Sequence, residues 1–143
     1  MQNRRFTTEN SPSRSRNFKV VVAFDDSTSS PALKTCEYVI QQLGEDIQVR
    51  RKLVDFNEES TPQRRAASAR DAAKADMVIV ATRDEKLPDS MQRWLDLWAE
   101  KRSTDEGALV ALVNGSASGV RDRLANVARR AHMDFFSSEV API

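Results

Sequence analysis

The stretch FKVVVAFDDSTSSPALKTCEYVIQQLG, residues 18–44, decides the fold. Its first part, FKVVVAF, is a short and nearly continuous apolar run, which is typical of a strand buried on both faces of a parallel sheet. The part from residue 30 onward has apolar side chains at helical spacing. We expect Ser30 as its N-cap, Pro31 at its first helical position and Gly44 at its end. A buried strand followed at once by an amphipathic helix opens a strand–helix–strand unit.

The same alternation continues along the chain. Further strands are expected at 47–56, 76–82, 107–115 and 133–136, and further helices at 60–75, 87–102 and 118–132. Five strands alternating with four helices indicate parallel, right-handed crossovers. The order 2-1-3-4-5 places the polar second strand at an edge and the three apolar strands in the middle. The sequence therefore predicts a three-layer, doubly wound α/β domain with a parallel five-stranded sheet.

The helix expected near residues 88–101 carries both tryptophans of the chain. Trp94 and Trp98 lie one turn apart and share a broad apolar stripe with Met91 and Leu95. Such a stripe is typical of a helix packed into the core. We therefore expect this helix to anchor the core, and not to line a ligand site.

Composition limits the function classes. The chain has 143 residues and a net charge of +1, so no global field draws it to nucleic acid or to an anionic membrane. No apolar stretch approaches the roughly 20 residues of a membrane-spanning helix. Cys36 and His132 are each the single residue of their type, which excludes an internal disulfide and a zinc site built from them. We expect a cytoplasmic protein without a metal.

The first residues differ in character from the rest. Residues 1–17 are polar, and their charged side chains are Arg4, Arg5, Arg14, Arg16 and Glu9. We expect a flexible N-terminal arm over 1–17, followed by a single domain over 18–143.

Ligands of such sheets bind beyond the carboxyl ends of the strands, where the first and third strands diverge. We call this region the mouth. Its expected residues are Asp25, Asp26, Ser27, Thr28, Ser29 and Ser30 after the first strand, Thr82, Arg83, Asp84, Glu85 and Lys86 after the third, and Asn114, Gly115, Ser116 and Ser118 after the fourth.

Two uses of the mouth find little support in its residues. A receiver-like phosphoacceptor could bind Mg²⁺ through Asp25 and Asp26, but Ala81 and Thr82 stand where the acceptor aspartate is needed. The stretch AFDDSTSSPALKTCEYVIQQLG also resembles the opening of universal stress proteins. The nucleotide binders of that family carry a long glycine-rich loop, and here the corresponding loop reads only NGSASG.

The longest resemblance is to flavodoxin-like, NADPH-dependent FMN reductases. ADMVIVATRDEKLPDSMQRWLDLW, residues 75–98, is similar to their third strand, its turn and the helix that follows. KLVDF and GALVALVNGSASG resemble their second strand and their fourth strand with its loop. The resemblance implies a flavodoxin-like fold. It also implies FMN as the cofactor, bound by Ser27, Thr28, Ser29, Ser30, Thr82, Arg83, Asn114 and Gly115.

The residues at the mouth depart from that family. Asp25 and Asp26 precede the hydroxyl residues and would repel a phosphate. The turn after the third strand reads RDEK, whereas a flavin ring needs apolar walls. We therefore interpret the turn after the first strand mainly as a helix start. We expect a non-catalytic regulatory or protein-interaction module without a cofactor, with an FMN-dependent oxidoreductase as the alternative.

No fifth helix is expected after the last strand, because the sequence stops seven residues after Phe136. The sheet face over the third to fifth strands would then be bare. We expect that face to carry Val78, Val80, Leu109, Ala111, Val113 and Phe135 or Phe136. A large bare apolar face is abnormal for a monomer, so we expect a homodimer through it. The alternative is that the terminal segments fold back over the sheet.

Overall fold

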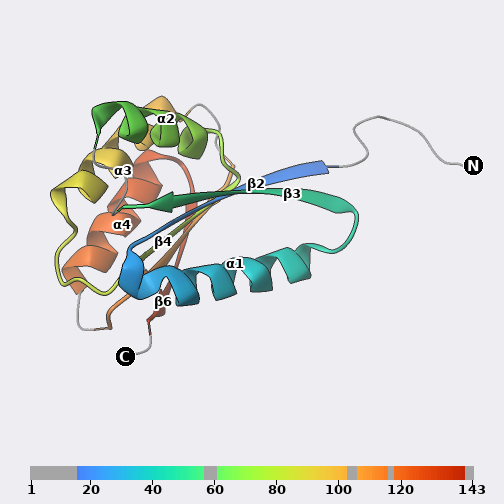
Figure 1. Ribbon diagram of the computed structural model, residues 1–143, viewed down its shortest axis with the longest axis horizontal. Coiled ribbons are helices and arrows are strands. Elements are labelled where there is room, and N and C mark those ends of the chain that lie inside the picture. Colours follow the sequence, from blue (N-terminus) through green and yellow to red (C-terminus); the bar gives the residue numbers. More distant parts are fainter. Residues whose placement is uncertain (1–15, 57–60, 103–105, 116–117, 141–143) are drawn as a thin grey trace, which may run out of the picture.

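The computed structural model describes residues 16–56, 61–102, 106–115 and 118–140. One parallel sheet contains β2 (Arg16–Phe24), β3 (Ile47–Asp55), β4 (Met77–Thr82), β5 (Ala108–Val113) and β6 (Asp134–Glu139). The order across it is β3-β2-β4-β5-β6 (Figure 1). Counted along the chain, this is the expected order 2-1-3-4-5, which confirms the doubly wound, flavodoxin-like topology.

Two strand boundaries differ from the prediction. Strand β2 begins at Arg16, inside the predicted arm, while residues 1–15 lie outside the described residues. Strand β6 continues past Phe136 to Glu139, because Ser137 to Glu139 pair with Ala111 to Val113 of β5. A polar continuation of an edge strand leaves no hydrophobic pattern from which to predict it.

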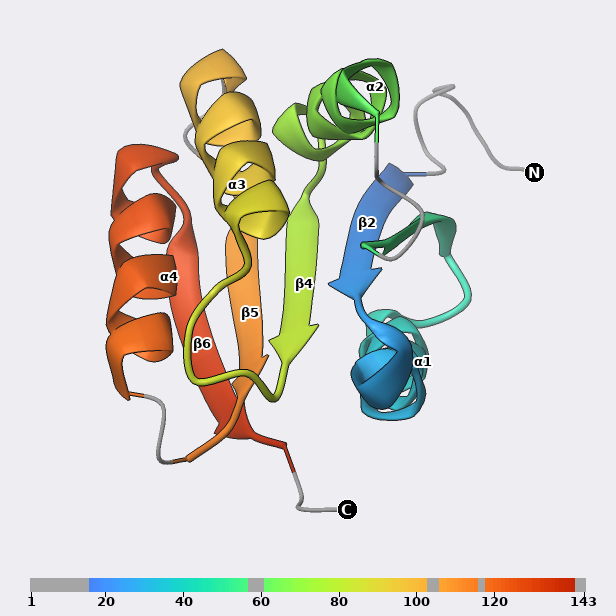
Figure 2. The same ribbon diagram turned by 60° about the vertical axis from the view of Figure 1, so that its left-hand side comes forward.

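The helices cover the two faces of the sheet unequally. A short 3₁₀ turn, η3 (Asp26–Thr28), leads into α1 (Ser29–Leu43); the others are α2 (Pro62–Ala73), α3 (Asp89–Lys101) and α4 (Ser118–Arg130). Helices α2, α3 and α4 lie on one face and α1 lies alone on the other. Figure 2 shows α1 beside β2 and away from β5 and β6. No helix follows β6 among the described residues, and none of the described helices is long and apolar enough to cross a membrane.

Most of the residues expected on the incompletely covered face lie on the other one, whereas Phe136 lies on the expected face. Val78, Val80, Leu109, Ala111 and Val113 pack among α2, α3 and α4 and are at most 4 % exposed. Side chains alternate along a strand, so a shift of one residue exchanges the faces. When a strand is apolar on both faces, its sequence does not show which of the two alternating sets of side chains points to which face. This part of the prediction was wrong.

The face that α1 covers alone is also less bare than expected. Its side chains on β4 and β5 include Ile79 and Leu112, which are at most 5 % exposed. Val140, just after β6, joins this cluster and is 8 % exposed. Met77 and Val110 are half-buried, and Phe136, opposite Val110 in the neighbouring strand, is 57 % exposed.

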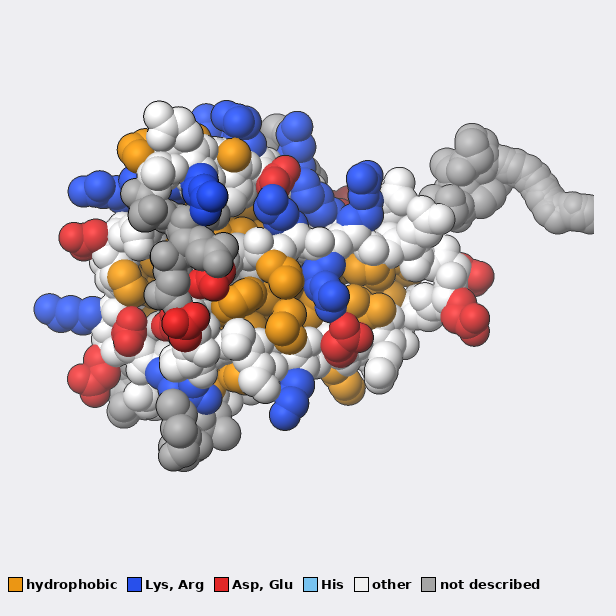
Figure 3. Space-filling view, viewed as in Figure 1, with side chains coloured by type: hydrophobic (Ala, Val, Ile, Leu, Met, Phe, Trp, Pro, Cys, Tyr) orange, Lys and Arg blue, Asp and Glu red, His pale blue; other side chains and the backbone are white. Residues whose placement is uncertain are grey.

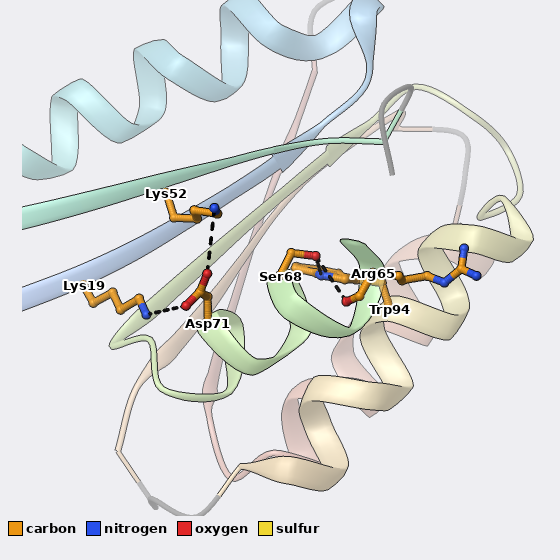
Figure 4. A network of polar contacts seen from close by, with 6 residues as sticks. All are labelled: Lys19, Lys52, Arg65, Ser68, Asp71 and Trp94. Carbon is orange, nitrogen blue, oxygen red and sulfur yellow. Dashed lines mark hydrogen bonds and ion pairs between the residues drawn. The ribbon is translucent and has the colours of Figure 1, made fainter. Parts of the chain in front are cut away.

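The tryptophan helix anchors the main core as predicted. Trp94 and Trp98 are fully buried, with ring centroids 6.0 Å apart. Phe56 packs edge-on against Trp94 at 5.4 Å. The indole Nε1 of Trp94 donates to the hydroxyl of Ser68 on α2 at 3.0 Å (Figure 4). This bond and the ring contacts fix α3 against α2 and the end of β3.

Candidate functional site

The mouth begins with a turn whose main-chain N–H groups are bonded to the side chain of Asp25. The Oδ1 atom of Asp25 accepts the main-chain N–H groups of Ser27 at 3.0 Å and of Thr28 at 3.1 Å. The hydroxyl of Ser27 lies 2.9 Å from the same oxygen. In return, the N–H of Asp25 donates to the Thr28 hydroxyl at 3.1 Å, which completes a capping box. Asp25, and not Ser30, is therefore the side-chain cap of this helix start.

The reason for this difference is the 3₁₀ turn. The sequence gives Ser30 and Pro31 as a good N-cap and first helical residue, but α1 begins at Ser29 and η3 precedes it. The chain therefore turns helical earlier, at Asp26, and the carboxylate one residue before that point takes the orphan N–H groups. Helix α2 begins with a hydroxyl cap followed by a proline. The Thr61 hydroxyl accepts the N–H of Arg64 at 3.2 Å.

Contacts between loops tie the mouth together. The Thr28 hydroxyl is fully buried and lies 3.1 Å from the carbonyl oxygen of Ala81 at the end of β4. Arg83, just past β4, donates from its guanidinium to the carbonyl oxygen of Ser27. Asn114 donates from its side-chain amide to the carbonyl oxygen of Arg83 at 3.4 Å. The loops after β2, β4 and β5 therefore meet, as the topology predicted.

The eight residues proposed for flavin binding have unequal access. Thr28 and Thr82 are buried; Ser29, Arg83 and Asn114 are half-buried; Ser27, Ser30 and Gly115 are exposed. Thr82 uses its hydroxyl within its own loop, where it accepts the N–H of Asp84 at 3.1 Å. The structure brings this set together at one edge of the sheet. Several of its polar groups are already engaged with protein atoms.

A further carboxylate, that of Glu139, lies at the mouth, and the sequence analysis missed it. A Cβ atom added to Gly115 would lie 1.6 Å from Oε1 of Glu139, so this carboxylate occupies the space beside Gly115. Glu139 reaches the mouth because β6 extends further than predicted. No sequence signal marks it, since the prediction ended the strand at Phe136. It adds negative charge beside Gly115, one of the residues proposed for flavin binding.

An open cavity of about 480 Å³ lies on the α4 side of the mouth. Leu87 and Val120 form its apolar floor, and Glu85, Lys86 and Arg123 stand around it. The rim therefore carries charges of both signs and does not select an anion or a cation. Trp94 and Trp98 are fully buried in the core and do not line this cavity.

Exposed apolar side chains lie at separate places on the α1 side of the sheet, since β3 and β6 are its opposite edge strands. Tyr38 on α1, Leu53 on β3 and Phe136 on β6 are 63 %, 44 % and 57 % exposed. Leu53 and Phe136 point to this face because their neighbours Val54 and Phe135 pack on the other one. Figure 3 shows hydrophobic surface running between β3 and α1, interrupted by charged side chains.

Cys36 lies beneath this surface and is fully buried. Burial raises the pKa of its thiol above the ordinary value, and the nearby Arg51 guanidinium offsets only part of that rise. The thiol therefore stays protonated near neutral pH. It acts as a small apolar core residue and not as a nucleophile.

Comparisons with known proteins do not identify a family for this chain. No protein-family model matches the sequence, and no curated protein is significantly similar to it.

Proposed function

We propose that this chain is a non-catalytic interaction module built on a flavodoxin-like scaffold. The observation that carries the proposal is the self-closed turn at the mouth. Its N–H groups at Ser27 and Thr28, the groups that would hold a phosphate, are already bonded to the Asp25 carboxylate. A phosphate would have to displace this carboxylate and then face the neighbouring Asp26.

The exposed apolar surface also supports this proposal. Leu53 and Phe136 lie on the α1 side of the sheet, at its two opposite edges, and Tyr38 lies on α1 itself. Large apolar side chains exposed at these places favour a protein partner over a small ligand. A lone, buried cysteine agrees with a cytoplasmic location for such a module.

An FMN-dependent oxidoreductase is the alternative, supported by the hydroxyl residues at the mouth and by the resemblance of residues 75–98. A flavin titration separates the two functions. Purified protein is titrated into FMN while flavin fluorescence is followed, with riboflavin as a control for ring binding without phosphate. We expect no saturable quenching at micromolar protein. Saturable quenching by FMN at that concentration would overturn the proposal.

We also propose self-association through the part of this face that carries Phe136. Phe136 lies opposite Val110 in the neighbouring strand, and both side chains point to the α1 side. A two-fold axis beside β6 would bring one Phe136 onto another and bury both. Sedimentation at low micromolar concentration is the test. We expect a species of twice 16.1 kDa that becomes a monomer when Phe136→Glu is introduced; a 16.1 kDa wild-type species would refute it.

A further inference from the structure

Strand β3 presents an open edge. It is the first strand of the sheet order, and among the described strands its one partner is β2. The N–H of Phe56, just beyond β3, donates to Phe24 of β2. Main-chain groups alternate in direction along a strand, so those of Val49, Arg51 and Leu53 point away from the sheet. These groups could pair with a further strand.

On the α1 side, this edge adjoins an open groove. The groove has a volume of about 550 Å³ and runs along α1, where Leu33 and Tyr38 line it. Glu37 belongs to the same flank of α1 and pairs with Arg51 of β3 at 2.7 Å. The residues that line the groove all belong to α1, and the Glu37–Arg51 pair places this flank of the helix beside β3. Leu53 of β3, outside the groove itself, adds exposed apolar surface on the same side of the sheet.

On the α2 side, the surface at β3 and its neighbour β2 is basic. Lys52 and Lys19 share one carboxylate, that of Asp71, at 3.9 and 3.3 Å (Figure 4). Two ammonium groups on one carboxylate leave positive charge in excess. Arg50 is exposed and has no acidic partner among the residues that the structure describes.

We propose that β3 binds an extended segment of another protein in which apolar and acidic residues alternate. The segment adds a strand to the sheet and bonds to the outward main-chain groups of Val49, Arg51 and Leu53. Its side chains alternate between the two faces. Apolar ones then lie on the α1 side beside Leu53 and the groove, and acidic ones lie on the α2 side beside Arg50 and Lys52. The proposal rests on the interaction function proposed above and names its partner class.

Charge selects this occupant over a second copy of the chain. Two β3 strands paired antiparallel about Arg51 would set Arg51 against Arg51 and Arg50 against Lys52. Like charges at directly opposed positions destabilise such a pair. The same charges protect the edge from unspecific pairing, and an acidic strand converts them into attraction.

The probe is a synthetic nonapeptide of alternating valine and glutamate, capped at both ends and labelled with a fluorophore. Its binding is followed by anisotropy, with an alternating valine and lysine peptide as control. We expect saturable binding by the acidic peptide only. Arg50→Glu should weaken it about tenfold, and so should raising the salt from about 0.05 to 0.5 M. Arg121→Glu, the same charge change on the exposed face of α4, should leave it unchanged.

Hydrogen exchange followed by NMR supplies a second readout at the level of single amides. The peptide should protect the N–H groups of Val49, Arg51 and Leu53 and leave those of Arg50 and Lys52 as they were. No binding at about 1 mM peptide, or protection elsewhere, overturns the proposal. Protection of the same amides that rises with protein concentration alone would assign the edge to a second copy and also overturn it. The flavin titration is independent, so the proposed function can stand when this proposal fails.

Discussion

The hydrogen bond between Trp94 and Ser68 gives the sharpest test of the main core. Ser68→Ala removes the acceptor of the fully buried indole N–H while the ring contacts of Trp94 stay in place. An orphaned buried donor costs about 1–3 kcal/mol. Alanine gains about 0.5 kcal/mol over serine inside α2 through its helix propensity. The net loss in the free energy of unfolding should therefore be about 0.5–2.5 kcal/mol.

Urea unfolding followed by far-ultraviolet circular dichroism measures this loss without relying on tryptophan fluorescence. Ala67→Ser, at the exposed neighbouring position on α2, is the matched control for propensity and should cost about 0.5 kcal/mol. In a Trp94→Phe background the donor is gone, so Ser68→Ala should keep only its propensity gain and stabilise by about 0.5 kcal/mol. If Ser68→Ala costs less than about 0.5 kcal/mol, or costs the same in both backgrounds, the bond does not stabilise the α2–α3 contact.

Three further changes test other parts of the molecule. Asp25→Ala removes the cap at the mouth and should lower the free energy of unfolding by about 1–2 kcal/mol, measured in urea; a neutral result would contradict the capping role. His132→Gly should raise it by about 0.5–1 kcal/mol, because His132 has φ 58° at the end of α4, a left-handed conformation that glycine adopts without strain; lower stability would show that the imidazole has contacts of its own. Above the ordinary pKa of a thiol, the unfolded chain loses the Cys36 proton before the folded one does, so stability falls as pH rises through the raised pKa. Cys36→Ala should flatten that fall in urea midpoints measured from pH 7 to 10, and an unchanged slope would assign it to other groups.

The fold could be predicted because hydrophobic periodicity and the composition of the strands indicate where helices and strands lie and which strands are central. The polar stretch 47–56 indicated an edge strand, and β3 lies at an edge. The facing of the central strands could not be predicted, since Val78 and Ile79 are equally apolar and both are fully buried. Arg102 gave no signal either. It donates to the carbonyl oxygens of Ala75 at 2.8 Å and Ala131 at 3.1 Å, a contact that only the folded chain creates.

At the mouth, the sequence identified which loops meet but not how their polar groups are used. Asp25 and Asp26 were expected to favour the helix start in general terms, and the structure shows Asp25 in a capping box with Thr28. The difference is one of main-chain geometry, because a 3₁₀ turn and an α-turn offer their N–H groups to different residues. Glu139 was out of reach for another reason. Its place depends on the length of an edge strand, which hydrophobic patterning does not fix.

The mouth and the α1 face are connected through the same helix. The carboxylate of Asp25 fixes the start of η3, and η3 leads directly into α1. Glu37, one of the α1 residues that line the groove, pairs with Arg51 of β3. A phosphate that displaced Asp25 would loosen the start of α1 and with it this contact. The carboxylate cap therefore keeps α1 in the position that the segment binding proposed at β3 requires.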